Sequence, residues 1–430
     1  MKRRTVLTAL SAVAAAGGLG SLVFAAIAWH TEIAPIAPPK LADFDPAIIR
    51  QGAALAAIGD CVVCHTATQG PAFAGGRALE TPFGTLYATN ITPDERTGIG
   101  NWSADAFRRA MRDGVSRDGE HLYPALPYEH FTRVTDADLD AIYAFLMTRA
   151  PVPKETPENR LIPPLGFRPL LAGWKLLFLH DDPVLPVAGQ SDEWNRGRYL
   201  VEGFGHCGGC HTPRNIAGGE ERGKPFAGGI AEGWDAPPLN AANRTAHPWT
   251  VDAVYRYLRT GMDAEHGIAN GPMGPVAHGL SGAPEDDVRS IAIYVASLLE
   301  RDGRKPDSLP PVDREADATR EHPEGAALFA GACATCHGPG APMMAQGRPS
   351  LSFVSALQAD HPRNAVQAVV NGLPAAQAGR TALMPPFQDS LTDAQIGQVM
   401  AYLRSRYSKR QPWTGLEDAV EEARSVEEQP

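Results

Sequence analysis

One pentapeptide pattern, Cys-x-x-Cys-His, occurs three times in the 430-residue chain and contains all six of its cysteines. The copies begin at Cys61, Cys207 and Cys333. Two thiols one helical turn apart can each add to a vinyl group on one edge of a porphyrin, and the histidine that follows then lies beneath the iron. The spacing therefore predicts three covalently bound haem c groups.

The predicted thioether attachments are Cys61, Cys64, Cys207, Cys210, Cys333 and Cys336, and the predicted proximal iron ligands are His65, His211 and His337. A zinc ribbon would need a second cysteine pair at short range, and a thioredoxin-like motif does not need the histidine. Because all three copies carry that histidine and no cysteine is left over, both alternatives are disfavoured. We predict no catalytic residue, since the chain has no dinucleotide fingerprint and no cysteine remains for an iron–sulphur cluster.

Composition sets the broad class of protein. The length suggests two to four domains, and the 43 glycines and 38 prolines fit short helices joined by long loops. The formal net charge is −10, with no basic run beyond the first residues, so we do not expect nucleic acid as a partner.

The N-terminus carries a targeting or anchoring signal. Lys2-Arg3-Arg4 precedes an uncharged run from Val6 to Ala28, and 23 helical residues would span about 34 Å, enough for a bilayer core of roughly 30 Å. Ala26-Ile27-Ala28 leaves a cleaved signal peptide open, whereas Trp29 suits the membrane interface. In both cases we expect the haem domains on the periplasmic side of the cytoplasmic (inner) membrane.

Each haem motif belongs to a longer repeat. A short helix with Gly52, Gly197 or Gly325 lies eight to ten residues before the first cysteine. Middle helices are expected over 103–113, 250–261 and 364–372, and last helices are expected to begin at Thr135, Pro284 and Thr392 and to carry Tyr143, Tyr294 and Tyr402. A small residue on the first helix and an aromatic one on the last allow the two helices to cross closely.

This order of elements resembles the class I cytochrome c domain, a small all-α fold around one haem. The resemblance implies an all-α protein of three tandem domains behind an N-terminal transmembrane anchor. The expected segments are an anchor or signal peptide (1–30), domain 1 (45–152), a linker with an apolar segment (153–189), domain 2 (190–300), domain 3 (320–408) and a solvated acidic tail (409–430).

The linker contains an apolar stretch, Leu161–Leu179, whose prolines and charges rule out a spanning helix. Its second half, Leu170–Leu179, could lie on the membrane surface, dock a partner or pack against the neighbouring haem domain.

A class I domain keeps an axial methionine just before its last helix. Met384 occupies that place 48 residues after Cys336, and Met273 occupies it in the second repeat. Met262 is the competing residue there and is expected to be a core side chain. Histidine below and methionine above the iron raise the potential and suit electron transfer.

The first repeat departs from this pattern because Leu126 stands where methionine is expected. His121 and His130 flank the loop, and either could give a bis-histidine haem of lower potential. A five-coordinate haem, or ligation by Met111 or Met147, stays open. His206, beside Cys207, is expected on the surface or against a propionate.

Two further stretches, Tyr87–Asp94 and Leu122–Tyr128, make the chain similar to the triheme cytochrome c subunit of bacterial periplasmic dehydrogenases. That family serves quinoprotein alcohol dehydrogenases, flavin-dependent sugar dehydrogenases, and molybdenum hydroxylases that act on aldehydes or N-heterocycles. Leu126 between two histidines favours the last group, whose catalytic subunits hold molybdopterin and iron–sulphur clusters.

The resemblance implies an electron relay that is not an enzyme alone. Electrons would pass from a catalytic dehydrogenase subunit through the haems to membrane ubiquinone or a terminal oxidase. Two rival functions remain: a haem peroxidase or reductase with an open first haem, and a cytochrome that serves a terminal oxidase.

Overall fold

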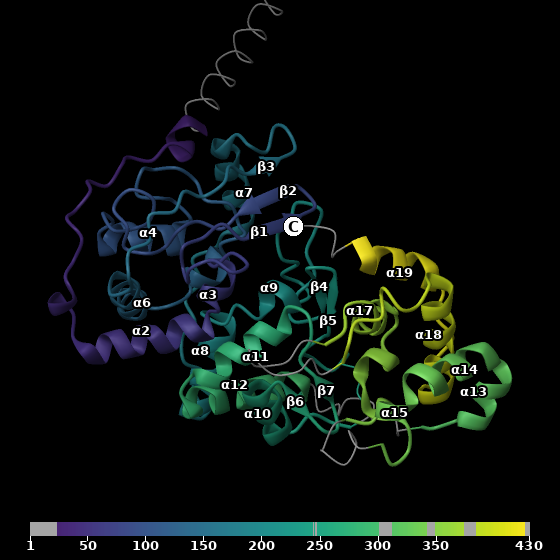
Figure 1. Ribbon diagram of the computed structural model, residues 1–430. Coiled ribbons are helices and arrows are strands. Elements are labelled where there is room, and N and C mark those ends of the chain that lie inside the picture. Colours follow the sequence, from purple (N-terminus) through teal and green to yellow (C-terminus); the bar gives the residue numbers. More distant parts are fainter. Residues whose placement is uncertain are drawn as a thin grey trace, which may run out of the picture. The chain divides into compact units, whose positions relative to one another are not determined.

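The structure, a computed structural model, describes residues 24–243, 245, 247–300, 312–341, 349–373 and 384–425. The chain divides into two units, of which the first comprises Met1–Leu185 with Glu202–His206 and the second comprises Pro186–Val201 with Cys207–Pro430. The first repeat thus lies in the first unit, and the second and third repeats share the second unit apart from Glu202–His206 (Figure 1).

The first unit is built around the crossing of its first and last long helices, α2 and α6 (Figure 1). Its helices are α2 (Pro46–Ile58), α3 (Cys61–Cys64), α4 (Ala104–Asp113), α5 (Tyr128–Phe131), α6 (Asp136–Met147) and α7 (Leu171–Phe178), with 3₁₀ turns η1 (Leu41–Asp43) and η2 (Arg168–Leu170). Its strands are β1 (Ala78–Thr81), β2 (Gly84–Tyr87) and β3 (Arg160–Leu161).

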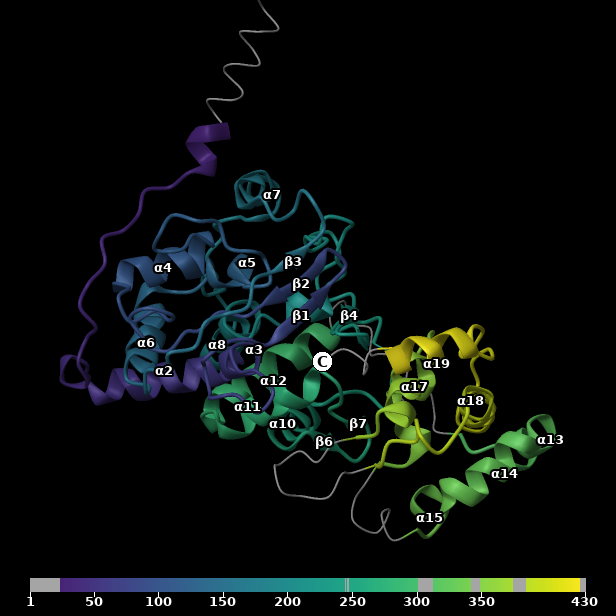
Figure 2. The same ribbon diagram turned by 45° about the horizontal axis from the view of Figure 1, so that its top comes forward.

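The second unit contains the second and third repeats, and each has a helix before the haem motif, a short helix within it, a middle helix and a last helix (Figure 2). The second repeat supplies α8 (Asp192–Glu202), α9 (Gly208–His211), α10 (Val251–Thr260), α11 (Met273–Gly282) and α12 (Glu285–Leu299), with β4 (Gly229–Ala231), β5 (Trp234–Ala236), β6 (Met262–Asp263) and β7 (Gly267–Ile268). The third supplies α13 (Glu315–Glu321), α14 (Pro323–Ala332), α15 (Ala334–His337), η4 (Leu351–Phe353), η5 (Ser355–Gln358), α17 (Arg363–Val370), α18 (Asp393–Tyr407) and α19 (Leu416–Ser425).

In the described part of the chain, three small antiparallel sheets correct the all-α expectation. β1, β2 and β3 form a three-stranded sheet, and β4–β5 and β6–β7 form two hairpins. Strands of two to four residues are too short to show the alternation of apolar and polar residues that would have predicted them. The described part of the fold is therefore helix-rich, with short strands after the first two haem motifs and one hairpin after α10.

The expected middle and last helices are present. Ser103 and Thr250 cap α4 and α10 with their side chains, and Thr135 and Thr392 cap α6 and α18 in the same way. The backbone amide of Thr392 also donates to Oε1 of Gln395, which completes a capping box and satisfies two amide groups at the helix start.

The close helix crossing at the glycine is confirmed in all three repeats, and the tyrosine Cβ lies at the crossing in the second and third. A Cβ atom on Gly52 would overlap the carbonyl of Ala141, and one on Gly197 would overlap that of Ser290. In the third repeat a Cβ on Gly325 would overlap the carbonyl of Gln398. Only glycine lets the first helix approach the backbone of the last helix this closely.

The acidic tail differs from the solvated end that was expected. Residues 416–425 form α19, which packs on α17 and α18 through Val420 and Ala423. The acidic residues lie on the exposed side of this amphipathic helix, and its apolar residues form a buried stripe. The charge of the segment alone therefore did not predict that it packs against the domain.

The predicted anchor lies largely outside the described residues. Residues 24–28 are helical, and Trp29 is 58% exposed with its ring 6.2 Å from that of Phe24. None of the helices in the described part of the chain combines the length and apolar character needed to cross a bilayer.

Candidate haem sites

The three cysteine pairs share one backbone geometry. In each motif the histidine amide donates to the carbonyl of the first cysteine, at 3.0 Å for His65, 3.0 Å for His211 and 2.9 Å for His337. One helical turn therefore brings both thiols to the same side of the short helices α3, α9 and α15. Cys64 and Cys336 are exposed, and the other four cysteines are half-buried.

Burial keeps the first thiol of each pair protonated before attachment. It raises the pKa of Cys61 to about 12, that of Cys207 to about 12 and that of Cys333 to about 11. A neutral first thiol, with the second thiol one turn of helix away, matches the thioether chemistry of haem c.

The first two histidines are oriented by backbone carbonyls. The Nδ1 atom of His65 lies 2.6 Å from the oxygen of Thr89, and that of His211 lies 2.7 Å from the oxygen of Pro237. A carbonyl only accepts, so Nδ1 carries the proton and Nε2 presents its lone pair, as a neutral metal-ligating histidine must. Burial lowers the pKa of both rings, which keeps them neutral. These residues fit a haem iron.

Burial also lowers the pKa of His337. The loop that follows its motif includes residues 342–348, which lie outside the described residues.

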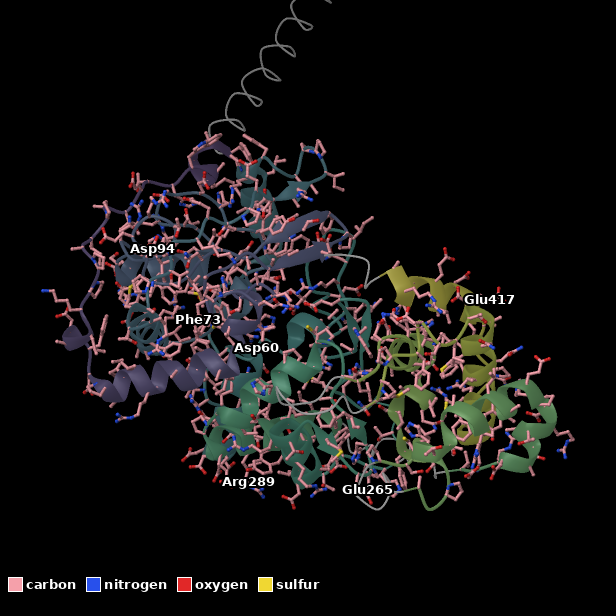
Figure 3. All side chains as sticks on the ribbon, in the orientation of Figure 1. Asp60, Phe73, Asp94, Glu265, Arg289 and Glu417 are labelled. Atoms are coloured by element: carbon pink, nitrogen blue, oxygen red, sulfur yellow. The ribbon has the colours of Figure 1, made fainter. Side chains whose placement is uncertain are left out.

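The sequence analysis missed the loops that supply these carbonyls, although a signal for them was present. Phe-Ala-Gly-Gly occurs twice, from Phe73 (Figure 3) and from Phe226. In both copies the first glycine donates its amide to the carbonyl of the preceding motif histidine, at 2.8 Å. Both phenylalanines adopt a positive φ, 64° and 57°, so each copy makes the same tight turn. The repeated tetrapeptide thus folds back against the histidine and begins the hairpin that ends near its carbonyl partner.

The predicted axial methionines lie in different local structures. Met384 forms an antiparallel bridge with Leu373, next to the undescribed residues 374–383. Met273 begins α11 rather than lying in an open loop. Met262, the competitor, begins β6. Ligation by Met384 and Met273 stays a prediction.

His121 and His130 occupy separate places in the first unit. His130, in α5, is 6% exposed, and its Nδ1 lies 3.0 Å from the carbonyl oxygen of Glu202. His121 is 3% exposed, and its Nδ1 lies 2.9 Å from Nζ of Lys175. The carbonyl fixes on His130 the same tautomer as on His65, whereas an ammonium donor at Nδ1 of His121 leaves the proton on Nε2.

The electrostatics of the two histidines differ as well. Burial, with the nearby charge of Lys175, lowers the pKa of His121 to about 4. Its ring packs edge-on against His30, 5.1 Å away, near the end of the N-terminal helix. His121 therefore belongs to a polar cluster with α7.

The remaining candidate residues lie in the core of the first unit or bond to its backbone. Met111 and Met147 are buried core side chains of α4 and α6. His206 lies in the first unit with its Nε2 atom 3.2 Å from the carbonyl oxygen of Gly59.

Comparison with known proteins places this geometry in a family. The chain is 35% identical to the gluconate 2-dehydrogenase cytochrome c subunit of Pantoea cypripedii, over 90% of this chain and 89% of that protein. It belongs to the cytochrome c subunits of dehydrogenases. The fructose dehydrogenase cytochrome subunit of Gluconobacter japonicus is 34% identical over 91% of this chain and 85% of its own length.

A much longer relative is also similar to this cytochrome. Over 95% of its length, the present chain is 44% identical to a nicotinate dehydrogenase subunit of Pseudomonas putida, and it spans 34% of that longer protein. Residues 320–403 match the family model described as cytochrome C oxidase, cbb3-type, subunit III. Membership implies covalently bound haem c and a role in electron transfer, and it confirms that the cytochrome is not itself the catalytic part of the complex.

Proposed function

We propose that this cytochrome holds three haems and passes electrons from a partner dehydrogenase subunit to an acceptor in the membrane. The observation that carries the proposal is the common geometry of the three motifs, in which each histidine amide bonds the first cysteine carbonyl. Bound haem would supply one-electron chemistry over a range of potentials that its ligands set.

The chain's own residues would hold each group in place. Six cysteines would form the thioethers, and His65, His211 and His337 would be proximal ligands. Met273 and Met384 would be distal ligands in the second and third repeats. In the first repeat we propose His130, because its Nδ1 is held by a carbonyl in the same way as that of His65. Bis-histidine ligation would give this site the lowest potential of the three.

The partner we propose is a molybdenum hydroxylase that oxidises an aldehyde or an N-heterocycle. The similarity to the nicotinate dehydrogenase relative supports it, as does Leu126 in place of methionine. A quinoprotein alcohol dehydrogenase or a flavin-dependent sugar dehydrogenase is the second candidate, supported by the gluconate and fructose dehydrogenase relatives. Ubiquinone or a terminal oxidase would accept the electrons.

We expect purified wild-type chain to contain three haems in a pyridine haemochrome assay. Replacing Cys333 and Cys336 by serine should reduce the count to two, because serine cannot form a thioether. Ala334→Ser introduces serine into the same helix but keeps both thiols, and should retain three haems. A wild-type count below three would exclude the triheme proposal.

We further propose that the cytochrome lies on the periplasmic face of the cytoplasmic membrane. α7 supports contact with the membrane, because Ala172 and Lys175 are buried on one side of the helix while Leu176 and Leu177 are 66% and 68% exposed. The polar cluster described above joins α7 to the end of the apolar N-terminal run, since His121 contacts both Lys175 and His30. An exposed apolar helix face beside an anchor suits the boundary of headgroups and acyl chains.

A nitroxide attached to the Leu177→Cys variant tests this membrane contact in the full chain in vesicles. We expect oxygen, which concentrates in lipid, to relax this label more strongly than a water-soluble nickel chelate. A label at position 216 is the control, because Ile216 is 98% exposed in the second unit and should favour the nickel chelate. Equal nickel access at the two positions would contradict contact of α7 with lipid.

A further inference from the structure

One short helix of the second unit contacts elements of both candidate haem sites in that unit. The N-terminal end of α17, in the third repeat, meets the β4–β5 hairpin of the second repeat, and both lie in the second unit (Figure 1). The C-terminal end of α17 meets the segment that carries Met384. Eight helical residues span only about 12 Å, so a displacement at one end is transmitted to the other.

Three side chains of α17 hold the hairpin, and we call them the α17 clamp: Arg363, Asn364 and Gln367. Arg363 forms an ion pair with Asp235. Asn364 accepts from the amide of Asp235 at 2.8 Å through Oδ1 and donates to its carbonyl at 2.8 Å through Nδ2. Gln367, fully buried, donates to the carbonyl of Gly233 at 3.2 Å.

The clamped hairpin is the one that orients the second proximal histidine. Asp235 lies two residues before Pro237, whose carbonyl oxygen is 2.7 Å from Nδ1 of His211. The asparagine side chain occupies both hydrogen-bonding groups of the Asp235 backbone, so that backbone cannot move without breaking two bonds. The clamp therefore limits the position of the carbonyl that His211 needs.

At the other end, α17 supports the Met384 segment. The amide of Phe387 donates to the carbonyl of Val369 at 3.0 Å, and that of Gln388 donates to Val370 at 3.3 Å. Gly372, two residues past the helix, has a φ of 70°, and a Cβ there would lie 2.6 Å from the carbonyl oxygen of Met384.

The ion pair of the clamp is sheltered. The side chains of Arg363 and Asp235 are 23% and 24% exposed. Arg363 also lies 3.5 Å from Glu422 of α19, so the C-terminal helix that had been expected to be solvated contributes to the clamp. A partly buried arginine with two carboxylates keeps its charge at every physiological pH.

We propose that α17 couples the second and third haem sites, with Arg363 and Asn364 as positioning residues for His211. The inference rests on the proposed function, because it takes His211 and Met384 as iron ligands.

The physical effect acts on the basicity of the proximal ligand. A hydrogen bond from Nδ1–H to a carbonyl makes the imidazole a stronger electron donor and stabilises the oxidised iron. Loosening the hairpin would weaken that bond. The midpoint potential of the second site should then rise, while the first site, in the other unit, should not change.

The test is a spectroelectrochemical titration of the full chain carrying Arg363→Gln and Asn364→Ala. The component that a Met273→Leu substitution alters identifies the second site. We expect the clamp variant to keep three haems and to shift that component to higher potential. Arg363→Lys keeps the positive charge at this position, so the second-site potential of this variant should lie closer to the wild-type value.

Arg289→Gln is the matched control, because Arg289 (labelled in Figure 3) forms an exposed ion pair with Asp252 that joins α10 and α12. It should leave every potential unchanged. An unchanged second potential in the clamp variant would overturn the inference, as would an equal shift in the control. If the clamp variant loses a haem, Asn364→Ala alone is titrated and decides in the same way. A wild-type chain with fewer than three haems would instead reject the proposed function.

Discussion

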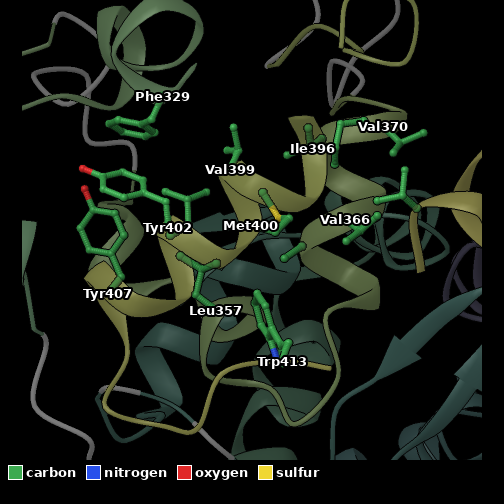
Figure 4. Packing of buried hydrophobic residues seen from close by; sticks show 14 of the residues in the cluster. Phe329, Leu357, Val366, Val370, Ile396, Val399, Met400, Tyr402, Tyr407 and Trp413 are labelled. Carbon is green, nitrogen blue, oxygen red and sulfur yellow. The ribbon is translucent and has the colours of Figure 1, made fainter. Parts of the chain in front are cut away.

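Replacing Gly325 by alanine should separate α14 from α18 and destabilise the third repeat by about 3 kcal/mol or more. The added methyl group would overlap the carbonyl of Gln398 and lie 2.8 Å from Cβ of Tyr402. Figure 4 shows Phe329 of α14 facing Tyr402 of α18, so the same displacement would open this aromatic contact, whose ring centroids lie 5.5 Å apart. Hydrogen exchange of peptides from both helices should show the loss of protection.

The same helix supplies the control for this substitution. Gly331 has no atom within 4 Å of its hypothetical Cβ, so Gly331→Ala should stabilise α14 by about 0.5–1 kcal/mol through helix propensity alone. If both variants showed the hydrogen exchange of the wild type, the prediction that the two helices approach closely at Gly325 would be wrong.

Replacing Lys175 by methionine should remove a pH dependence from the stability of the first unit. Burial lowers the pKa of Lys175 to about 7, although its Nζ donates to the carbonyls of Asp113 and Gly114 at 2.7 and 2.6 Å. In the unfolded chain the amine titrates near its ordinary value, so between pH 7 and about 10 the unfolded state binds more protons. Wild-type stability should therefore rise with pH across this window, by at most about 5 kcal/mol.

Urea unfolding at pH 7 and pH 9.5 measures the effect as the difference between the wild type and Lys175→Met. The variant should lose the rise and also be less stable at the higher pH, because the end of α4 loses its donor. Lys224→Met, at a position 62% exposed, should keep the wild-type rise. An equal rise in Lys175→Met would show that Lys175 is not buried against α4.

Local spacing was enough to predict the haem motifs and the helices around them. The bond from histidine to the first cysteine joins residues four apart, and a cap such as Thr135 acts within the first turn of its own helix. Such contacts repeat wherever the spacing repeats, so a single pattern in the chain predicts each of them. The close helix crossing at the glycine followed as well, because one helix geometry serves all three repeats.

The amino-acid sequence by itself determined the haem motifs, the helix starts and the crossing glycines. Only the tertiary structure decided which carbonyls orient His65 and His211, that His121 meets Lys175, and that α17 holds a hairpin 128 residues earlier in the chain. These contacts join residues far apart in sequence, and each depends on a single side chain or carbonyl rather than on a repeating sequence pattern. No local pattern encodes such a pairing, because its partner is selected only when the helices pack.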